Sequence, residues 1–177
     1  MKKIKTIGVI VIFLLTVLYH FLYEWLPNPV FSVFFPVNES IWEHMKLLYS
    51  GFLTWGVIEY FILKKKNIKF TNYFSSLFLT MIISIILYLI IYLPLYNLFG
   101  ENMIISIGLL LIVIVIMTIF NFYLINRKEE NSFFNKVSVI LIILGYIVFL
   151  SLTYDPPKNY IFYDNTENKY GIDIYTK

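Results

Sequence analysis

Five long apolar runs dominate this sequence and limit what it can fold into. They lie near Thr6–Leu26, Ile41–Leu63, Thr71–Tyr96, Met103–Ile125 and Phe133–Tyr154. Each is at least as long as the roughly 20 residues that a helix needs to cross the hydrocarbon core of a bilayer. Because a lipid-embedded backbone must pair its polar groups internally, such runs form helices. The sequence therefore predicts an all-α fold, a polytopic membrane bundle of five transmembrane helices.

The composition supports a membrane location and excludes some other classes. Hydrophobic residues make up 59% of the 177 residues and charged residues only 14%, which leaves too little polar surface for a soluble domain of this size. The net charge of +3 comes from short lysine clusters between apolar runs, so it does not indicate nucleic-acid binding. The absence of cysteine excludes disulfides and thiolate chemistry. The expected surroundings are the lipid bilayer of a bacterial cytoplasmic membrane, with a small molecule, lipid or protein as the remaining candidate partner.

The basic residues predict the orientation of the bundle. Ten of the fourteen fall at the N-terminus, between the second and third runs, or between the fourth and fifth. They are Lys2, Lys3, Lys5, Lys64, Lys65, Lys66, Lys69, Arg127, Lys128 and Lys136. Since Lys and Arg are enriched on the cytoplasmic side, the N-terminus is expected inside and, after five crossings, the C-terminus outside.

This topology divides the chain into two parts. Residues 1–154 form the expected five-helix transmembrane domain, and residues 155–177 form a short extracytoplasmic polar tail. The tail begins with Pro156-Pro157 and contains the turn-forming stretch "DNTENKYG". It is too short for a separate domain. We expect it to lie over the outer face of the bundle as a short hairpin.

The stretch "PVNESIWEHMKLL" at residues 36–48 concentrates ionisable groups in an otherwise apolar chain. Ser40 and Glu43 have the spacing of a capping box, and Asn38 is a competing N-cap. Helix capping alone therefore accounts for Asn38, Ser40 and one glutamate. It does not account for His44, which is one of the two histidines in the chain.

The two histidines are predicted to lie at similar depth near the outer boundary. His20 and Glu24 are four residues apart and share a helix face, while Glu43 and His44 begin the next helix. A short connection makes the two helices antiparallel neighbours, so these four residues are expected to converge. His and Glu side chains are ligands for zinc or a similar divalent metal. A hydrogen-bonded His–Glu network or a proton relay fits the same residues. Glu39 and Lys46 are further site candidates.

The other polar residues of the runs are interpreted structurally. Glu59 precedes the Lys64 cluster by about one turn and is expected to reach the inner interface by itself. Asn121 is expected to form a hydrogen bond between helices. Rows of tyrosine and phenylalanine in the third to fifth runs are interpreted as packing. The sequence contains no phosphate-binding loop, no nucleophile elbow and no internal repeat.

Three sequence blocks resemble domain-of-unknown-function family 6512, a family of small bacterial integral membrane proteins. The blocks are "HFLYEW", "FFPVNESIWEHMKLL" and "YDPPKNYIFYDNTENKYGI". The matching residues are His20, Tyr23, Glu24, Trp25, Pro36, Asn38, Glu39, Ser40, Trp42, Glu43, His44, Lys46, Pro156, Pro157, Asp164, Tyr170 and Gly171. One departure is Asn165, where the family pattern leads us to expect proline. The resemblance implies the membrane topology and adds Asp164 to the site candidates, but it implies no activity.

Two classes of function fit these features. The first is a non-catalytic binding, accessory or immunity-type membrane protein. The second is a membrane-embedded, metal-dependent hydrolase or transferase that acts on a lipid or envelope precursor. In the second case Glu43, His44 and His20 are the candidate catalytic residues, with Glu43 as the base or a metal ligand and the two histidines as metal ligands or proton carriers. The sequence does not decide between an enzyme and a binding protein.

Overall fold

The structure is a computed structural model that describes residues 1–172. The helices in chain order are α1 (Lys2–Trp25), α2 (Pro29–Phe34), α3 (Ile41–Lys65), α4 (Tyr73–Phe99), α5 (Met103–Ile125) and α6 (Ser132–Tyr154). A two-stranded hairpin follows, formed by β1 (Tyr163–Asp164) and β2 (Lys169–Tyr170). The described chain is therefore predominantly helical, and its long helices lie within a few residues of the predicted ranges. Of the predicted tail, residues 173–177 lie outside the described part.

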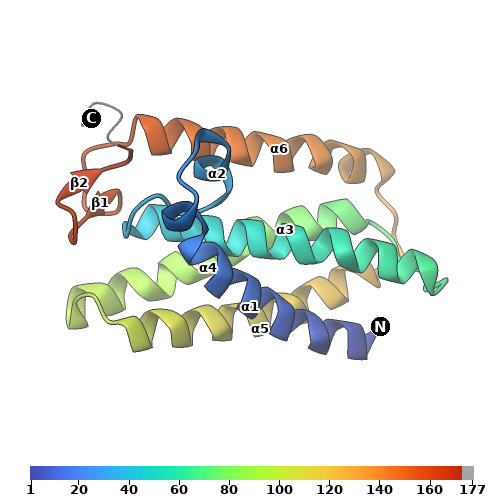
Figure 1. The fold of residues 1–177 in the computed structure, drawn as a ribbon. Coiled ribbons are helices and arrows are strands. Elements are labelled where there is room, and N and C mark those ends of the chain that lie inside the picture. Colours follow the sequence, from blue (N-terminus) through green and yellow to red (C-terminus); the bar gives the residue numbers. More distant parts are fainter. Residues whose placement is uncertain (173–177) are drawn as a thin grey trace.

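The long helices pack side by side as a bundle (Figure 1). Helix α3 packs against α1 and α4, and α5 closes this group by contacting both α1 and α4. Helix α6 also packs against α4, and the short α2 packs against α6. Met45, Leu48 and Tyr49 of α3 are almost completely buried, so α3 forms the centre of the core.

In the described part of the chain, four helices are long and apolar enough to cross a membrane, namely α1, α4, α5 and α6. They carry large exposed hydrophobic side chains such as Leu14, Ile90 and Ile143, which is the surface expected to face lipid. Helix α3 is not among these four helices, and it contains the buried charged residues Glu43, Lys46 and Glu59. The predicted count of five spans is therefore supported for four helices only.

The connection between α1 and α3 is ordered by side-chain caps. Asn28 caps α2 by accepting hydrogen bonds from the backbone N–H groups of Val30 and Phe31, and Pro29 starts that helix. Ser40 caps α3 and accepts from the N–H of Glu43 at 3.3 Å. The reciprocal half of the capping box is not formed, because the N–H of Ser40 donates to Asn38 instead. Helix α2, with six residues, is a short helix within this connection.

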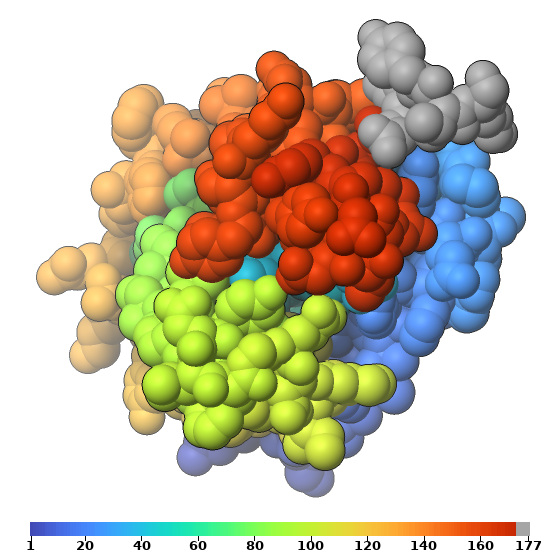
Figure 2. All heavy atoms as spheres, turned by 90° about the vertical axis from the view of Figure 1, so that its left-hand side faces the viewer, coloured from blue at the N-terminus to red at the C-terminus, as the bar shows by residue number. Residues whose placement is uncertain are grey.

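The tail forms the expected hairpin and lies over the start of α3. Strands β1 and β2 pair antiparallel, and Gly171 adopts a positive φ of 57° where a side chain would meet the carbonyl of Thr153. The N–H of Trp42 donates to the carbonyl of Ile161 at 2.9 Å, and the side chain of Asn38 donates to the carbonyl of Gly171 at 3.0 Å. Figure 2 shows this end of the molecule, with a hollow between the red tail and the yellow-green turn from α4 to α5.

Candidate functional site

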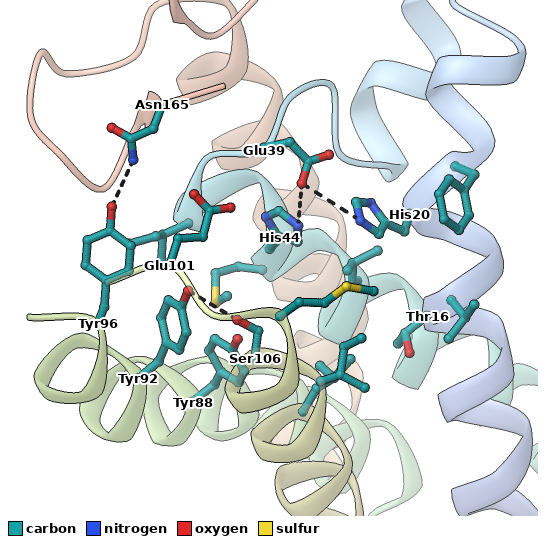
Figure 3. Close-up of a pocket in the computed structure, with 18 of the residues that line it drawn as sticks. Thr16, His20, Glu39, His44, Tyr88, Tyr92, Tyr96, Glu101, Ser106 and Asn165 are labelled. Atoms are coloured by element: carbon teal, nitrogen blue, oxygen red, sulfur yellow. Dashed lines mark hydrogen bonds and ion pairs between the residues drawn. The ribbon is translucent and has the colours of Figure 1, made fainter. Parts of the chain in front are cut away.

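His20, Glu39 and His44 converge at this end of the bundle (Figure 3). The Nε2 atom of His44 lies 3.4 Å from Oε2 of Glu39, and Nε2 of His20 lies 3.8 Å from the same oxygen. One ligand atom from each of the three residues lies within 4.8 Å of the others. The two imidazole rings are 5.1 Å apart, edge to face. Two imidazoles and a carboxylate thus form one compact polar group.

Local structure fixes the orientation of His44. Its Nδ1 atom lies 2.9 Å from the backbone carbonyl of Ser40, one turn earlier in α3. A carbonyl oxygen can only accept a hydrogen bond, so this contact places the proton on Nδ1. The Nε2 atom then faces Glu39, so that it donates a hydrogen bond to the Glu39 carboxylate when it carries a proton and can bind a metal ion when it does not.

The structure brings together only part of the predicted four-residue cluster. His20 and His44 meet, but the third member is Glu39 instead of Glu24 or Glu43. Glu24 is exposed and does not line the cavity described below. Glu43 follows Ser40 into the helix and points about 100° away from His44, because adjacent helical residues diverge by that angle. Its carboxylate is buried against other partners.

Glu43 and Lys46 form a buried ion pair on the opposite side of α3. The Nζ atom of Lys46 lies 2.6 Å from Oε2 of Glu43 and donates to the carbonyl of Ser32 at 2.7 Å. Thr153 of α6 donates to the other carboxylate oxygen of Glu43 at 2.7 Å and accepts from Lys46 at 2.7 Å. The pair joins α2, α3 and α6. Lys46, predicted as a site candidate, is therefore a structural anchor that does not line the cavity.

Asp164 holds the backbone of Glu39 from the tail. Its Oδ2 accepts the N–H of Glu39 at 3.0 Å, and its Oδ1 accepts from the N–H and hydroxyl of Thr166 and the N–H of Glu167. Burial alone would raise the pKa of the Asp164 carboxyl, but these hydrogen bonds outweigh it and lower the pKa below its ordinary value.

For Glu39, the hydrogen bond with His44 outweighs partial burial and likewise lowers the pKa.

The lowered pKa of Asp164 predicts that the tail detaches in acid. A carboxyl with a depressed folded-state pKa stabilises the structure above its unfolded-state value, near pH 4, and loses that contribution as the pH falls through the folded-state pKa. The protection factors of the amide hydrogens in residues 161–172, that is, their exchange rates relative to an unfolded chain at the same pH, should therefore be high at neutral pH and fall below about pH 4. In Asp164→Asn this step should disappear, and the protection factors should already be low at neutral pH. An unchanged profile in that variant would contradict the assigned role.

The three converging residues lie at one end of a cavity of about 440 Å³. Residues from α1, α3, α4, α5 and the tail line it. The polar lining residues are Thr16, His20, Glu39, His44, Tyr88, Tyr92, Tyr96, Glu101, Ser106, Tyr163 and Asn165. The apolar lining residues are Phe13, Val17, Phe21, Ile41, Met45, Leu47, Met103, Ile107 and Leu110. A cavity of this size, apolar on one side and polar on the other, is typical of small-molecule sites.

A row of tyrosines on α4 forms one wall of the cavity. Tyr88, Tyr92 and Tyr96 are spaced by four residues, and successive ring centroids are 5.1 and 5.9 Å apart. Ser106 donates to the hydroxyl of Tyr92, and Asn165 of the tail donates to that of Tyr96. Because the tyrosine rows were interpreted as packing alone, their position in the wall of a cavity was not predicted. The four-residue spacing, which places side chains on one helix face, was the available signal.

A second buried charge network lies toward the opposite end of the bundle. Lys5 of α1 donates to Oε2 of Glu59 at 2.8 Å and to Oδ1 of Asn121. Tyr73 also donates to Glu59, at 3.1 Å. The prediction that Glu59 reaches the interface by itself was wrong, because the side chain is 3% exposed and paired. The predicted interhelical bond of Asn121 is confirmed, since its amide also donates to Thr80 at 2.9 Å.

The long apolar helices and their exposed hydrophobic surfaces are those of a multi-pass membrane protein. Residues 1–172 match the family of unknown function DUF6512, and the chain belongs to that family. The resemblance drawn from the three sequence blocks is thereby confirmed. No curated protein and no solved structure matches the chain.

Proposed function

We propose that the chain crosses the bacterial cytoplasmic membrane five times, with its N-terminus inside and its C-terminus outside. Helix α3 runs beside α1 and α4, and its buried charges are paired as Glu43–Lys46 and Lys5–Glu59. Paired charges inside a bundle are compatible with a membrane span, because they are not presented to lipid. The lysine-rich connections lie at the end marked N in Figure 1, and the tail lies at the other end. The positive-inside rule supports this orientation.

The outer end of this bundle is proposed to bind a divalent metal ion such as zinc through His20, Glu39 and His44. The observation that carries the proposal is the spacing of the three ligand atoms. Ligands of a tetrahedral zinc ion, with bonds near 2.0–2.1 Å, lie roughly 3.3–3.5 Å from one another. The Glu39 oxygen is already 3.4 Å from one imidazole nitrogen and 3.8 Å from the other. The backbone contact of His44 Nδ1 is the type of supporting hydrogen bond that metal-bound histidines make.

Zinc titration of the purified, metal-stripped protein tests this proposal. One zinc ion per chain is expected, and His44→Ala should lower the affinity by at least about a hundredfold because a direct ligand is lost. Glu24→Gln is the matched control, since Glu24 is an exposed acid one turn beyond His20 and should have no effect. Equal zinc binding by the wild type and His44→Ala would refute the site.

The best-supported function is therefore that of a metal-binding membrane protein with a ligand cavity. A metal-dependent hydrolase or transferase is the second candidate, and one observation favours it. The site offers three protein ligands beside a cavity, which is the arrangement of catalytic zinc sites that keep one position open for water or substrate. Glu43 does not fit the role of base, because its carboxylate is directed away from the cavity toward Lys46 and Thr153.

A further inference from the structure

We propose that the cavity binds amphiphilic organic cations, meaning molecules with a basic or quaternary nitrogen attached to a hydrocarbon chain. This inference goes beyond metal binding and does not require a metal ion. It combines three properties of the cavity, namely the charge of its polar end, its aromatic wall and its apolar lining. Each property is set by different residues and can be changed separately.

The charge of the lining favours a cation. Two carboxylates, Glu39 and Glu101, line the cavity, while no lysine or arginine appears among its lining residues in the described part of the chain. Glu101 stands in the turn between α4 and α5, and in Figure 3 its carboxylate points to the same end of the cavity as that of Glu39. Glu39 has two basic neighbours there, His20 and His44. In contrast, no basic residue of the described lining is paired with Glu101, so an anionic headgroup near Glu101 would meet an uncompensated negative charge. A positively charged nitrogen is attracted by both.

The tyrosine wall adds a second preference for a cation. Tyr88, Tyr92 and Tyr96 come from consecutive turns of α4 and line the same cavity as Glu101. Aromatic faces attract ammonium groups through their quadrupoles, and aromatic surroundings are a common means of holding quaternary nitrogens. Figure 3 shows the rings of Tyr92 and Tyr96 standing between α4 and the polar end of the cavity. A cationic headgroup held near Glu101 would therefore lie beside them.

The remaining lining suits a hydrocarbon chain. Phe13, Met45, Leu47 and Leu110 supply apolar surface to the cavity. Val17 of α1 and Ile107 of α5 line the cavity and are also exposed on the surface of apolar helices. A chain bound here would therefore extend toward the lipid-facing surface between α1 and α5. The ligand is accordingly expected to be an amphiphile and not a small hydrophilic amine.

Binding of radiolabelled decyltrimethylammonium to the whole protein in phosphatidylcholine nanodiscs, in metal-free buffer, tests the proposal. Empty nanodiscs give the background from partitioning into lipid. We expect one saturable site per chain that prefers this cation to neutral decyl glucoside by at least about tenfold. Affinity should rise about fourfold for each methylene added between the octyl and decyl homologues, as expected for burial of a hydrocarbon chain.

Two variants separate this site from the metal site. Glu101→Gln should weaken binding of the cation about tenfold and leave zinc binding unchanged, because Glu101 is not part of the His20–Glu39–His44 group. His44→Ala should abolish zinc binding but should not reduce the preference for the cation over decyl glucoside, since His44 is a basic residue and not one of the two carboxylates that attract the cation. Glu129→Gln, an exposed acid in the connection between α5 and α6, is the control. A failure of zinc to bind would thus leave the cation result intact.

Either of two results would overturn the proposal. One is equal affinity for decyltrimethylammonium, decyl glucoside and decyl sulfate. The other is wild-type affinity for the cation in Glu101→Gln. Because Glu101 is exposed, this variant is expected to fold, and an unchanged thermal unfolding midpoint checks that it does.

Discussion

Replacing Lys46 with methionine is expected to destabilise the protein by about 3–5 kcal/mol. The substitution keeps most of the volume of the side chain but leaves the carboxylate of Glu43 buried without its positive partner. The side chains of Lys46 and Glu43 are 0% and 2% exposed, so water cannot replace the lost contact. The hydrogen bond from Lys46 to the carbonyl of Ser32 in α2 is lost as well.

Thermal unfolding in detergent micelles measures this effect, with an expected fall in the midpoint on the order of 10 °C. Lys65→Met is the matched control, since Lys65 is an exposed lysine at the end of the same helix. The double variant Glu43→Gln with Lys46→Met should be more stable than Lys46→Met alone, because it removes the unpaired charge. If the double variant were the less stable of the two, the ion pair would not be the source of the effect.

Lys5→Met is expected to have an effect of similar size at the other end of the bundle, about 3–5 kcal/mol. Here the group left without its cation is Glu59, whose Oε2 accepts from Lys5 and Tyr73 while its Oε1 has no hydrogen-bond partner among residues 1–172. Losing Lys5 therefore leaves a buried carboxylate with a single donor. Asn121 also loses the hydrogen bond to its side-chain oxygen.

The same unfolding assay tests this second prediction, with Lys3→Met as the control because Lys3 is an exposed lysine of the same helix. Glu59→Gln should also be destabilising, in contrast to the expectation for a glutamate that reaches the interface alone. A variant Lys5→Met as stable as Lys3→Met would show that the Lys5–Glu59 contact contributes little to stability.

The sequence predicted the helices well because their signal is local. Length and hydropathy define each apolar run, and Asn38, Ser40 and the tail turn carry standard capping and turn residues. The proximity of His20 to His44 was also predictable, since a short connection places the ends of two antiparallel helices together.

The partners of the buried charges were not predictable in the same way. Glu43 pairs with Thr153, and Lys5 pairs with Glu59, across separations of 110 and 54 residues. Whether a side chain faces such a distant partner depends on how its helix is rotated about its own axis within the bundle. Helices α4 and α5 are apolar on nearly all sides, so their sequences give little information about rotation. Glu39 was named as a candidate, but its role depends on the tail contact with Asp164 that fixes its backbone.

The contact of Thr153 with Glu43 and Lys46 has a consequence for biosynthesis. The ribosome makes Glu43 and Lys46 about 5–20 seconds before Thr153, given the separation of 110 residues and ordinary elongation rates. During that interval the ion pair lacks its partner from α6, and the cap of Ser40 lacks the covering tail. The end of the bundle that contains His20, Glu39 and His44 is therefore completed only after α6 and the tail have been made, although Glu43 and Lys46 are made well before them.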